Sequence, residues 1–91
     1  MGHITANKDK VMARVRRIAG QVAAIERSVA ADAPCSETLH LAAAVRGAVA
    51  GLMDELVEEH LFEHVAAPGL SDEERRLAAT ELAVLTRRHL K

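Results

Sequence analysis

The sequence predicts an all-α protein with three helices per protomer and a long central helix, and three observations support this fold class. Apolar residues recur three and four positions apart along most of the chain, which is the period of an α-helix. They are mostly Ala, Val and Leu, with Phe62 the only aromatic residue, and such small side chains suit close-packed helices. Two segments that contain Pro separate three periodic stretches.

We expect the first helix over about residues 8–31, after a flexible N-terminal arm over residues 1–7 that lacks periodicity. Pro34 ends this helix, because it disfavours helical geometry at the residue before it. Six apolar residues spaced by four and three place a seam along one side of the helix: Val11, Val15, Ile18, Val22, Ile25 and Val29.

The second helix is expected over about residues 36–65, since no residue breaks the apolar repeat before Pro68 and Gly69. Its first half is rich in Ala and Gly, which leave room for a neighbouring backbone. Ser71 and Glu74 then form a capping-box signature for a third helix over about residues 71–90. The whole chain, residues 1–91, therefore reads as a single domain.

Length and composition limit the classes of protein. A domain of 91 residues buries a modest fraction of its surface, so self-association is a reasonable expectation. The single Cys cannot form an intrachain disulfide, and no apolar run approaches a membrane span or a signal peptide. These features predict a cytoplasmic protein without a membrane partner.

The net charge of -1 hides an uneven distribution. Residues 1–34 carry six basic and three acidic side chains, a net of +3, whereas residues 35–70 carry one basic and six acidic side chains, a net of -5. This pattern fits a polyanion-binding face and a cation-binding site on different parts of one molecule. It also fits two solvated helix surfaces.

His60 and His64 are four residues apart, so on one helix both imidazoles project from the same face. Such a pair is able to ligate one metal ion, although many pairs at this spacing have no ligand. Cys35 is the only thiol, and thiolate with imidazole favours cobalt, nickel, zinc or copper over calcium or magnesium. Alternatively, Cys35 is an inert, small apolar residue at a helix start.

The length of the second helix decides how these ligands meet. If it is continuous, Cys35 and His60 are about 37 Å apart at ~1.5 Å of rise per residue, too far to share an ion within one chain. In an antiparallel pair of chains, Cys35 of one chain lies beside His60 and His64 of the other. The ligand site is then formed twice, at dimer interfaces. His3, in the arm, is a further candidate ligand.

A stripe of polar residues spaced by four, three and four lies one position from the apolar seam: Lys10, Arg14, Arg17 and Gln21. It is able to lie against phosphates, or it is a solvated helix surface. Arg46, the only basic residue of the second helix, lies among Ala and Gly and also invites an anionic partner. No recognition-helix motif is present, so binding to double-stranded DNA would depend on charge and DNA shape.

These features together resemble the CsoR/RcnR/FrmR family of bacterial repressors. The matching stretches are residues 14–21 (RVRRIAGQ), Cys35, residues 43–48 (AAVRGA), residues 51–53 (GLM) and His60 with the residues after it. The resemblance implies an antiparallel helical-bundle dimer that assembles into a disc-like tetramer and binds operator DNA until a ligand releases it. It also implies that His3, Cys35, His60 and His64 are the ligand positions, a set that looks like the nickel and cobalt sensors of the RcnR type, with zinc also compatible.

Two other interpretations remain at this stage. Formaldehyde-responsive members resemble this chain, use the equivalent of Cys35 with an N-terminal amine, and usually have an acidic residue where His64 stands. The second residue here is Gly2, and a primary amine is still able to condense with an aldehyde. A small all-α enzyme of the chorismate mutase kind, using Arg14, Arg46 and Glu55, would leave the Cys and His residues without a task, so we do not expect an enzyme.

Overall fold

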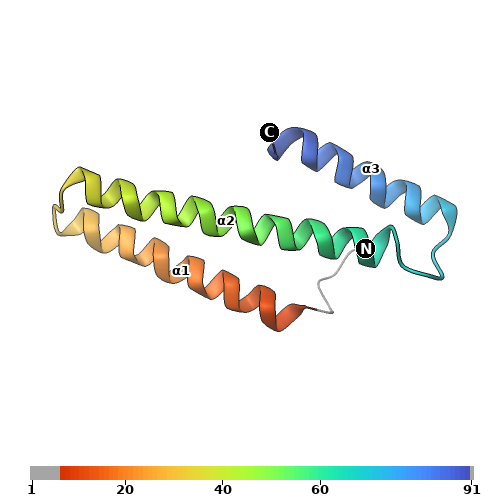
Figure 1. Ribbon diagram of the computed structural model, residues 1–91, viewed down its shortest axis with the longest axis horizontal. Coiled ribbons are helices and arrows are strands. Elements are labelled where there is room, and N and C mark those ends of the chain that lie inside the picture. Colours follow the sequence, from red (N-terminus) through yellow and green to blue (C-terminus); the bar gives the residue numbers. More distant parts are fainter. Residues whose placement is uncertain (1–6, 91) are drawn as a thin grey trace. The chain divides into compact units, whose positions relative to one another are not determined.

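A computed structural model describes residues 7–90, and in that range the chain forms three α-helices and no strand (Figure 1). α1 spans Lys8–Ala30, α2 spans Cys35–His64 and α3 spans Asp72–His89. The all-α class with a long central helix is confirmed. Among the described residues, no helix is both long and apolar enough to cross a membrane.

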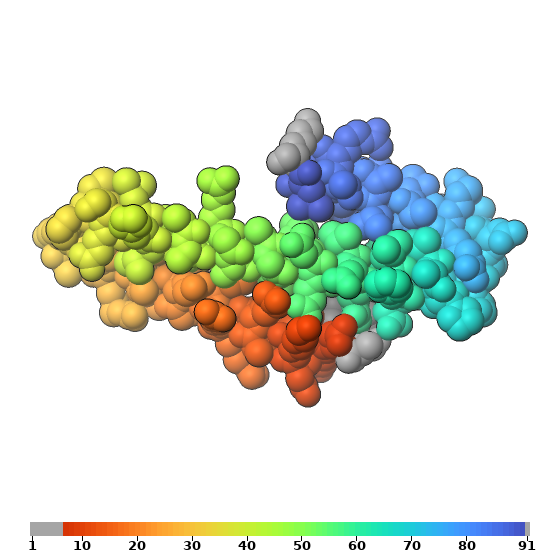
Figure 2. All heavy atoms as spheres, viewed as in Figure 1, coloured from red at the N-terminus to blue at the C-terminus, as the bar shows by residue number. Residues whose placement is uncertain are grey.

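The chain divides into two compact units, and the boundary between them lies within α2, between Asp54 and Glu55. The first unit runs from Lys8 to Asp54 and contains α1 and the first part of α2. Within it the two helices run antiparallel (Figure 1), and Figure 2 shows their atoms in contact along the pair. The second unit begins at Glu55 and combines the last part of α2 with α3 and with Asn7.

The apolar seam of α1 splits into two rows of residues, each with a seven-residue repeat. In one row Val11 is buried and Ile18 and Ile25 are half-buried. In the other row the exposed fractions are 40% for Val15, 50% for Val22 and 61% for Val29. The protomer therefore covers only one side of the seam.

A left-handed residue ends α1 and turns the chain toward α2. Asp32 has a φ of 53°, and its backbone N–H donates to the carbonyl of Val29 while that of Ala33 donates to Ser28. These two bonds form a Schellman motif, which satisfies carbonyls left open at the helix end. The buried Ser28 hydroxyl also lies 2.8 Å from the Thr38 hydroxyl, which ties the end of α1 to the start of α2.

The capping box predicted at the start of α3 is confirmed. Glu74 N–H donates to Ser71 Oγ at 3.1 Å, and Ser71 N–H donates to Glu74 Oε1 at 2.9 Å. The backbone hydrogen bond from Ser71, followed by the side-chain one, lowers the pKa of Glu74. A lowered carboxyl pKa contributes stability above the ordinary pKa, and this contribution is lost as the pH falls through the lowered value.

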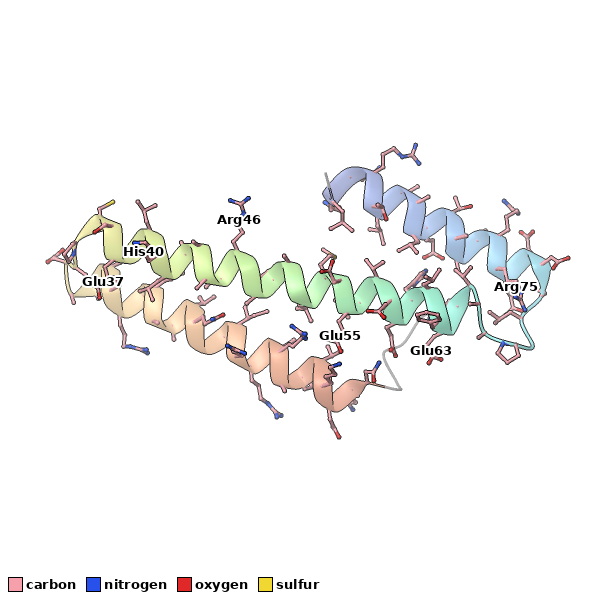
Figure 3. All side chains as sticks on the ribbon, in the orientation of Figure 1. Glu37, His40, Arg46, Glu55, Glu63 and Arg75 are labelled. Atoms are coloured by element: carbon pink, nitrogen blue, oxygen red, sulfur yellow. The ribbon has the colours of Figure 1, made fainter. Side chains whose placement is uncertain are left out.

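Arg75 holds together the turn between α2 and α3 (Figure 3). Its guanidinium donates to the carbonyls of Val65 at 3.3 Å and Ala67 at 3.1 Å, and its Nε reaches the carbonyl of Leu70 at 3.5 Å. A guanidinium fork suits this task because it presents several donors in one plane. The turn therefore depends on one side chain for much of its carbonyl pairing.

Replacing Arg75 with Ala is expected to lower the free energy of unfolding by about 1–2 kcal/mol, because carbonyls paired with a charged donor lose their partner. Thermal unfolding at fixed protein concentration measures this change. Arg76 is the matched control: it makes an exposed 2.8 Å ion pair with Glu73 on the same helix. Arg76→Ala should cost less than about 0.5 kcal/mol. Equal losses for the two variants would contradict the role of Arg75.

Candidate metal centre and nucleic-acid interface

His60 and His64 lie close together in the last turns of α2. Their ring centroids are 5.2 Å apart, with the ring planes inclined by 53°, and both residues are half-buried. The uninterrupted helix produces this arrangement, since residues four apart occupy one face. The predicted proximity of the two imidazoles is therefore present within a single chain.

A hydrogen bond from α3 orients His60. His60 Nε2 lies 3.1 Å from the carbonyl oxygen of Ala78, a buried residue of α3. A carbonyl only accepts, so this hydrogen bond requires a proton on Nε2, and in the neutral imidazole the lone pair is then on Nδ1. Protein metal sites commonly fix an imidazole in this way, with one nitrogen donating to a carbonyl and the other available as a ligand. Nδ1 is thus the atom of His60 suited to a metal.

Glu59, next to His60, is also part of this region. The residue is only 6% exposed, and its Oε2 accepts a 3.0 Å hydrogen bond from Asn7 Nδ2. Asn7 directly precedes α1, and this contact joins it to α2 at the residue before His60. The sequence does not single out Glu59, because nothing in the local pattern separates it from the other acidic residues of α2.

The other two candidate ligands do not join the His pair within the described chain. Cys35 is exposed and is the first residue of α2, whereas the His pair is at the end of the same helix. His3 lies outside the described residues. Over residues 7–90, no three His, Cys, Asp or Glu side chains are close enough together to hold one ion. A site with more than the His pair therefore needs ligands beyond those that this part of one chain brings together.

Four of the five candidate DNA-contacting residues share one concave surface of the first unit. Lys10, Arg14, Arg17 and Gln21 of α1 line it together with Ala44 and Ala48 of α2. The spacing of the four residues along α1 places them on one face. The buried Oε1 of Gln21 has no hydrogen-bond partner among the described residues. This arrangement offers a cationic surface to an anion.

The fifth candidate, Arg46, lies elsewhere. Figure 3 shows it projecting from the side of α2 that faces away from α1, and its side chain is exposed. The structure does not bring it together with the other four residues in one protomer. Because Arg46 is exposed there, the cost of burying an unpaired charge does not arise within the protomer.

A family model described as a metal-sensitive transcriptional repressor matches residues 7–88. The chain belongs to this family, the CsoR/RcnR/FrmR repressors. It is 42% identical over 76 residues to the transcriptional repressor RcnR of Salmonella arizonae, covering 84% of this chain and 82% of that protein. It is also 41% identical over 91 residues, the full length of both proteins, to a Serratia marcescens protein described as uncharacterized and encoded in the 5′ region of bioA.

The fold agrees with a solved structure from the same family. A variant of the formaldehyde-responsive regulator FrmR from Salmonella enterica serovar Typhimurium matches with a TM-score of 0.88 and 40% identity, covering 97% of this chain and 99% of that chain. The protein is therefore a helical transcriptional repressor of the RcnR/FrmR type, and its family implies operator DNA as a partner. Family members are regulators and not enzymes, which removes the chorismate mutase alternative.

Proposed function

We propose that this repressor leaves its operator when it binds a transition-metal ion, with nickel or cobalt favoured and zinc also compatible. The observation that carries this proposal is the oriented pair of His60 and His64, in which the Ala78 carbonyl accepts a hydrogen bond from Nε2 of His60 and leaves Nδ1 for a metal. Imidazole with an accessible thiol, here Cys35, is a donor set for borderline and soft metals rather than for calcium or magnesium.

The complete site would lie between two chains. In an antiparallel dimer, Cys35 at the start of α2 in one chain would meet the His pair at the end of α2 in the other. The contact between Asn7 and Glu59 joins Asn7 to α2 at the residue before His60, which favours His3 as an additional ligand from the same chain as the His pair. When bound, the ion would supply a link between two protomers.

The uncovered side of α1 supports self-association. Val15, Val22 and Val29 repeat every seven residues and leave an apolar row exposed in the protomer. In water, covering such a row with a second helix is favourable because it buries apolar surface, as in coiled coils. We infer that a second copy of the chain covers it in a dimer, and that two dimers form the disc-like tetramer typical of the family.

The DNA contacts would come from the cationic surface of α1. We propose that Lys10, Arg14, Arg17 and Gln21 contact phosphates, and that Arg46 adds a contact from the other side of α2 in the assembled protein. Because metal binding fixes one packing of the protomers, it would shift the population away from the arrangement in which these residues match the DNA.

A titration of nickel, cobalt and zinc against the repressor–operator complex tests the proposal. Fluorescence anisotropy of a labelled operator fragment should fall as metal saturates the protein. An unchanged anisotropy at saturating metal, measured with metal content confirmed on the same sample, would refute metal-driven release.

Formaldehyde is the second candidate inducer, and the structural match to FrmR favours it. The N-terminal amine would condense with the aldehyde, and the Cys35 thiolate would add to the resulting imine, so that one methylene joins nitrogen and sulfur and one water leaves. Intact-mass analysis after mild formaldehyde exposure should then show a gain of about 12 Da that requires Cys35. Release by metal without this gain would decide for the metal, and the reverse result would decide for formaldehyde.

A further inference from the structure

Gly51, in the interior of α2, lies directly beneath the guanidinium of Arg14. A Cβ built at Gly51 would be 2.9 Å from Arg14 Nη1 and 3.9 Å from Arg14 Cζ. The shorter distance is well inside the ~3.5–4.0 Å at which heavy atoms pack favourably. A side chain at residue 51 would therefore exclude the guanidinium of Arg14 from its observed position.

The other helical glycines do not share this property. A Cβ at Gly20 or Gly47 would have no heavy atom within 4 Å. Gly is the least favourable residue in a helix interior after Pro, so a Gly there needs a reason. In the protomer, the closeness of Arg14 is such a reason for Gly51, whereas Gly47 has no comparable neighbour.

The obstacle that an Ala at position 51 would meet is the end of a flexible side chain. The helix itself would accept the methyl group, and Arg14 would move away from α2. The substitution would therefore displace the guanidinium and leave the fold unchanged. Arg14 belongs to the cationic surface that includes Lys10, Arg17 and Gln21, so its position decides where one charge of that surface lies.

We propose that Gly51 is a positioning residue for DNA binding: it lets the guanidinium of Arg14 lie against α2, in the orientation that meets a DNA phosphate. This inference rests on the proposed DNA contact of Arg14. An Arg that already occupies this position before binding loses less conformational freedom when it binds, which favours the complex. Gly51 acts through Arg14 and does not itself touch DNA.

The test compares the wild-type repressor with Gly51→Ala, Arg14→Ala and the double variant, and uses Gly47→Ala as a matched control on the same helix. We expect Gly51→Ala to weaken operator binding about 3- to 10-fold, with an unchanged or higher thermal unfolding temperature. Gly47→Ala should change the affinity less than about 2-fold by the same measure. In the Arg14→Ala background, Gly51→Ala should have no further effect, because the two residues act together.

A second measurement follows Arg14 without DNA. The side-chain Nε–H signal of Arg14 in a ¹H–¹⁵N NMR spectrum should be shifted from the free-arginine position in the wild-type and Gly47→Ala proteins, and should return toward it in Gly51→Ala. An unchanged Arg14 signal in Gly51→Ala would overturn the inference, as would equal affinity losses for Gly51→Ala and Gly47→Ala. Normal operator binding by Arg14→Ala would instead refute the proposed DNA contact, and the NMR comparison would still decide whether Gly51 positions Arg14.

Discussion

Replacing His60 with Ala is expected to abolish release from the operator by nickel or cobalt, because it lowers metal affinity by at least about 100-fold. The reason is that the hydrogen bond from Nε2 to the Ala78 carbonyl leaves Nδ1 of His60 available as a ligand. The ring centroids of His60 and His64 are 5.2 Å apart. Removal of a ligand lowers the metal affinity more than the loss of a hydrogen bond that supports a ligand. The loss of such a supporting bond usually lowers the affinity by about 10- to 100-fold. Competition with a metal-binding dye measures the affinity.

His40→Ala is the control for this experiment. His40 is on the same helix, is exposed, and has no second imidazole at metal-binding spacing. It should therefore keep the metal affinity and the release of the wild-type protein. In the absence of metal, the His60→Ala protein should bind the operator as tightly as wild type. If His60→Ala still released DNA at the wild-type metal concentration, the candidate centre would be wrong.

The sequence was sufficient for those features that depend on neighbours along the chain. Helical periodicity predicted three helices with a long second one, and the pair Ser71 and Glu74 predicted the capping box. The proximity of His60 and His64 followed in the same way, since an unbroken helix fixes the relation of residues four apart. Each of these predictions needed only local geometry.

Features that depend on how helices pack could not be predicted. The carbonyl that fixes His60 comes from Ala78, 18 residues later, and any helical residue offers a carbonyl. In the sequence, Arg75 does not differ from the other basic residues of α3, and only the structure shows its contacts with the turn. In the sequence, nothing separates Gly51 from the other small residues of α2, whereas the structure places a guanidinium there. Residue type and spacing along the chain do not predict such contacts between elements.

The α1 seam combines a feature that the sequence predicts with one that it does not. The sequence placed six apolar residues on one side of a helix, but it did not indicate which would be covered within the protomer. Val11 is buried, whereas Val29 at the other end is 61% exposed. A seam that one neighbour covers only in part is expected where a helix has a second apolar neighbour, which is the situation in a helical bundle. The uncovered row is thus a physical reason to look for ligands from a second chain.

A mixing experiment gives the sharpest test of a site shared between chains. Cys35→Ala and His60→Ala should each bind no metal tightly when alone. When the two are unfolded together and refolded at equal amounts, half of the dimers contain one chain of each kind. In such a dimer, the His pair of the Cys35→Ala chain meets Cys35 of the other chain, and this restores one of its two sites. The mixture should recover about one quarter of the wild-type sites.

The matched control mixes His60→Ala with His64→Ala. Their rings are close within one chain, so each site needs both imidazoles from the same protomer. No dimer of this mixture contains an intact pair, and it should recover no tight sites. Recovery here, or none with Cys35→Ala and His60→Ala, would contradict the shared site. The two mixtures contain the same number of His60 substitutions, so a difference between them reports which chain supplies each ligand rather than how many ligands are present.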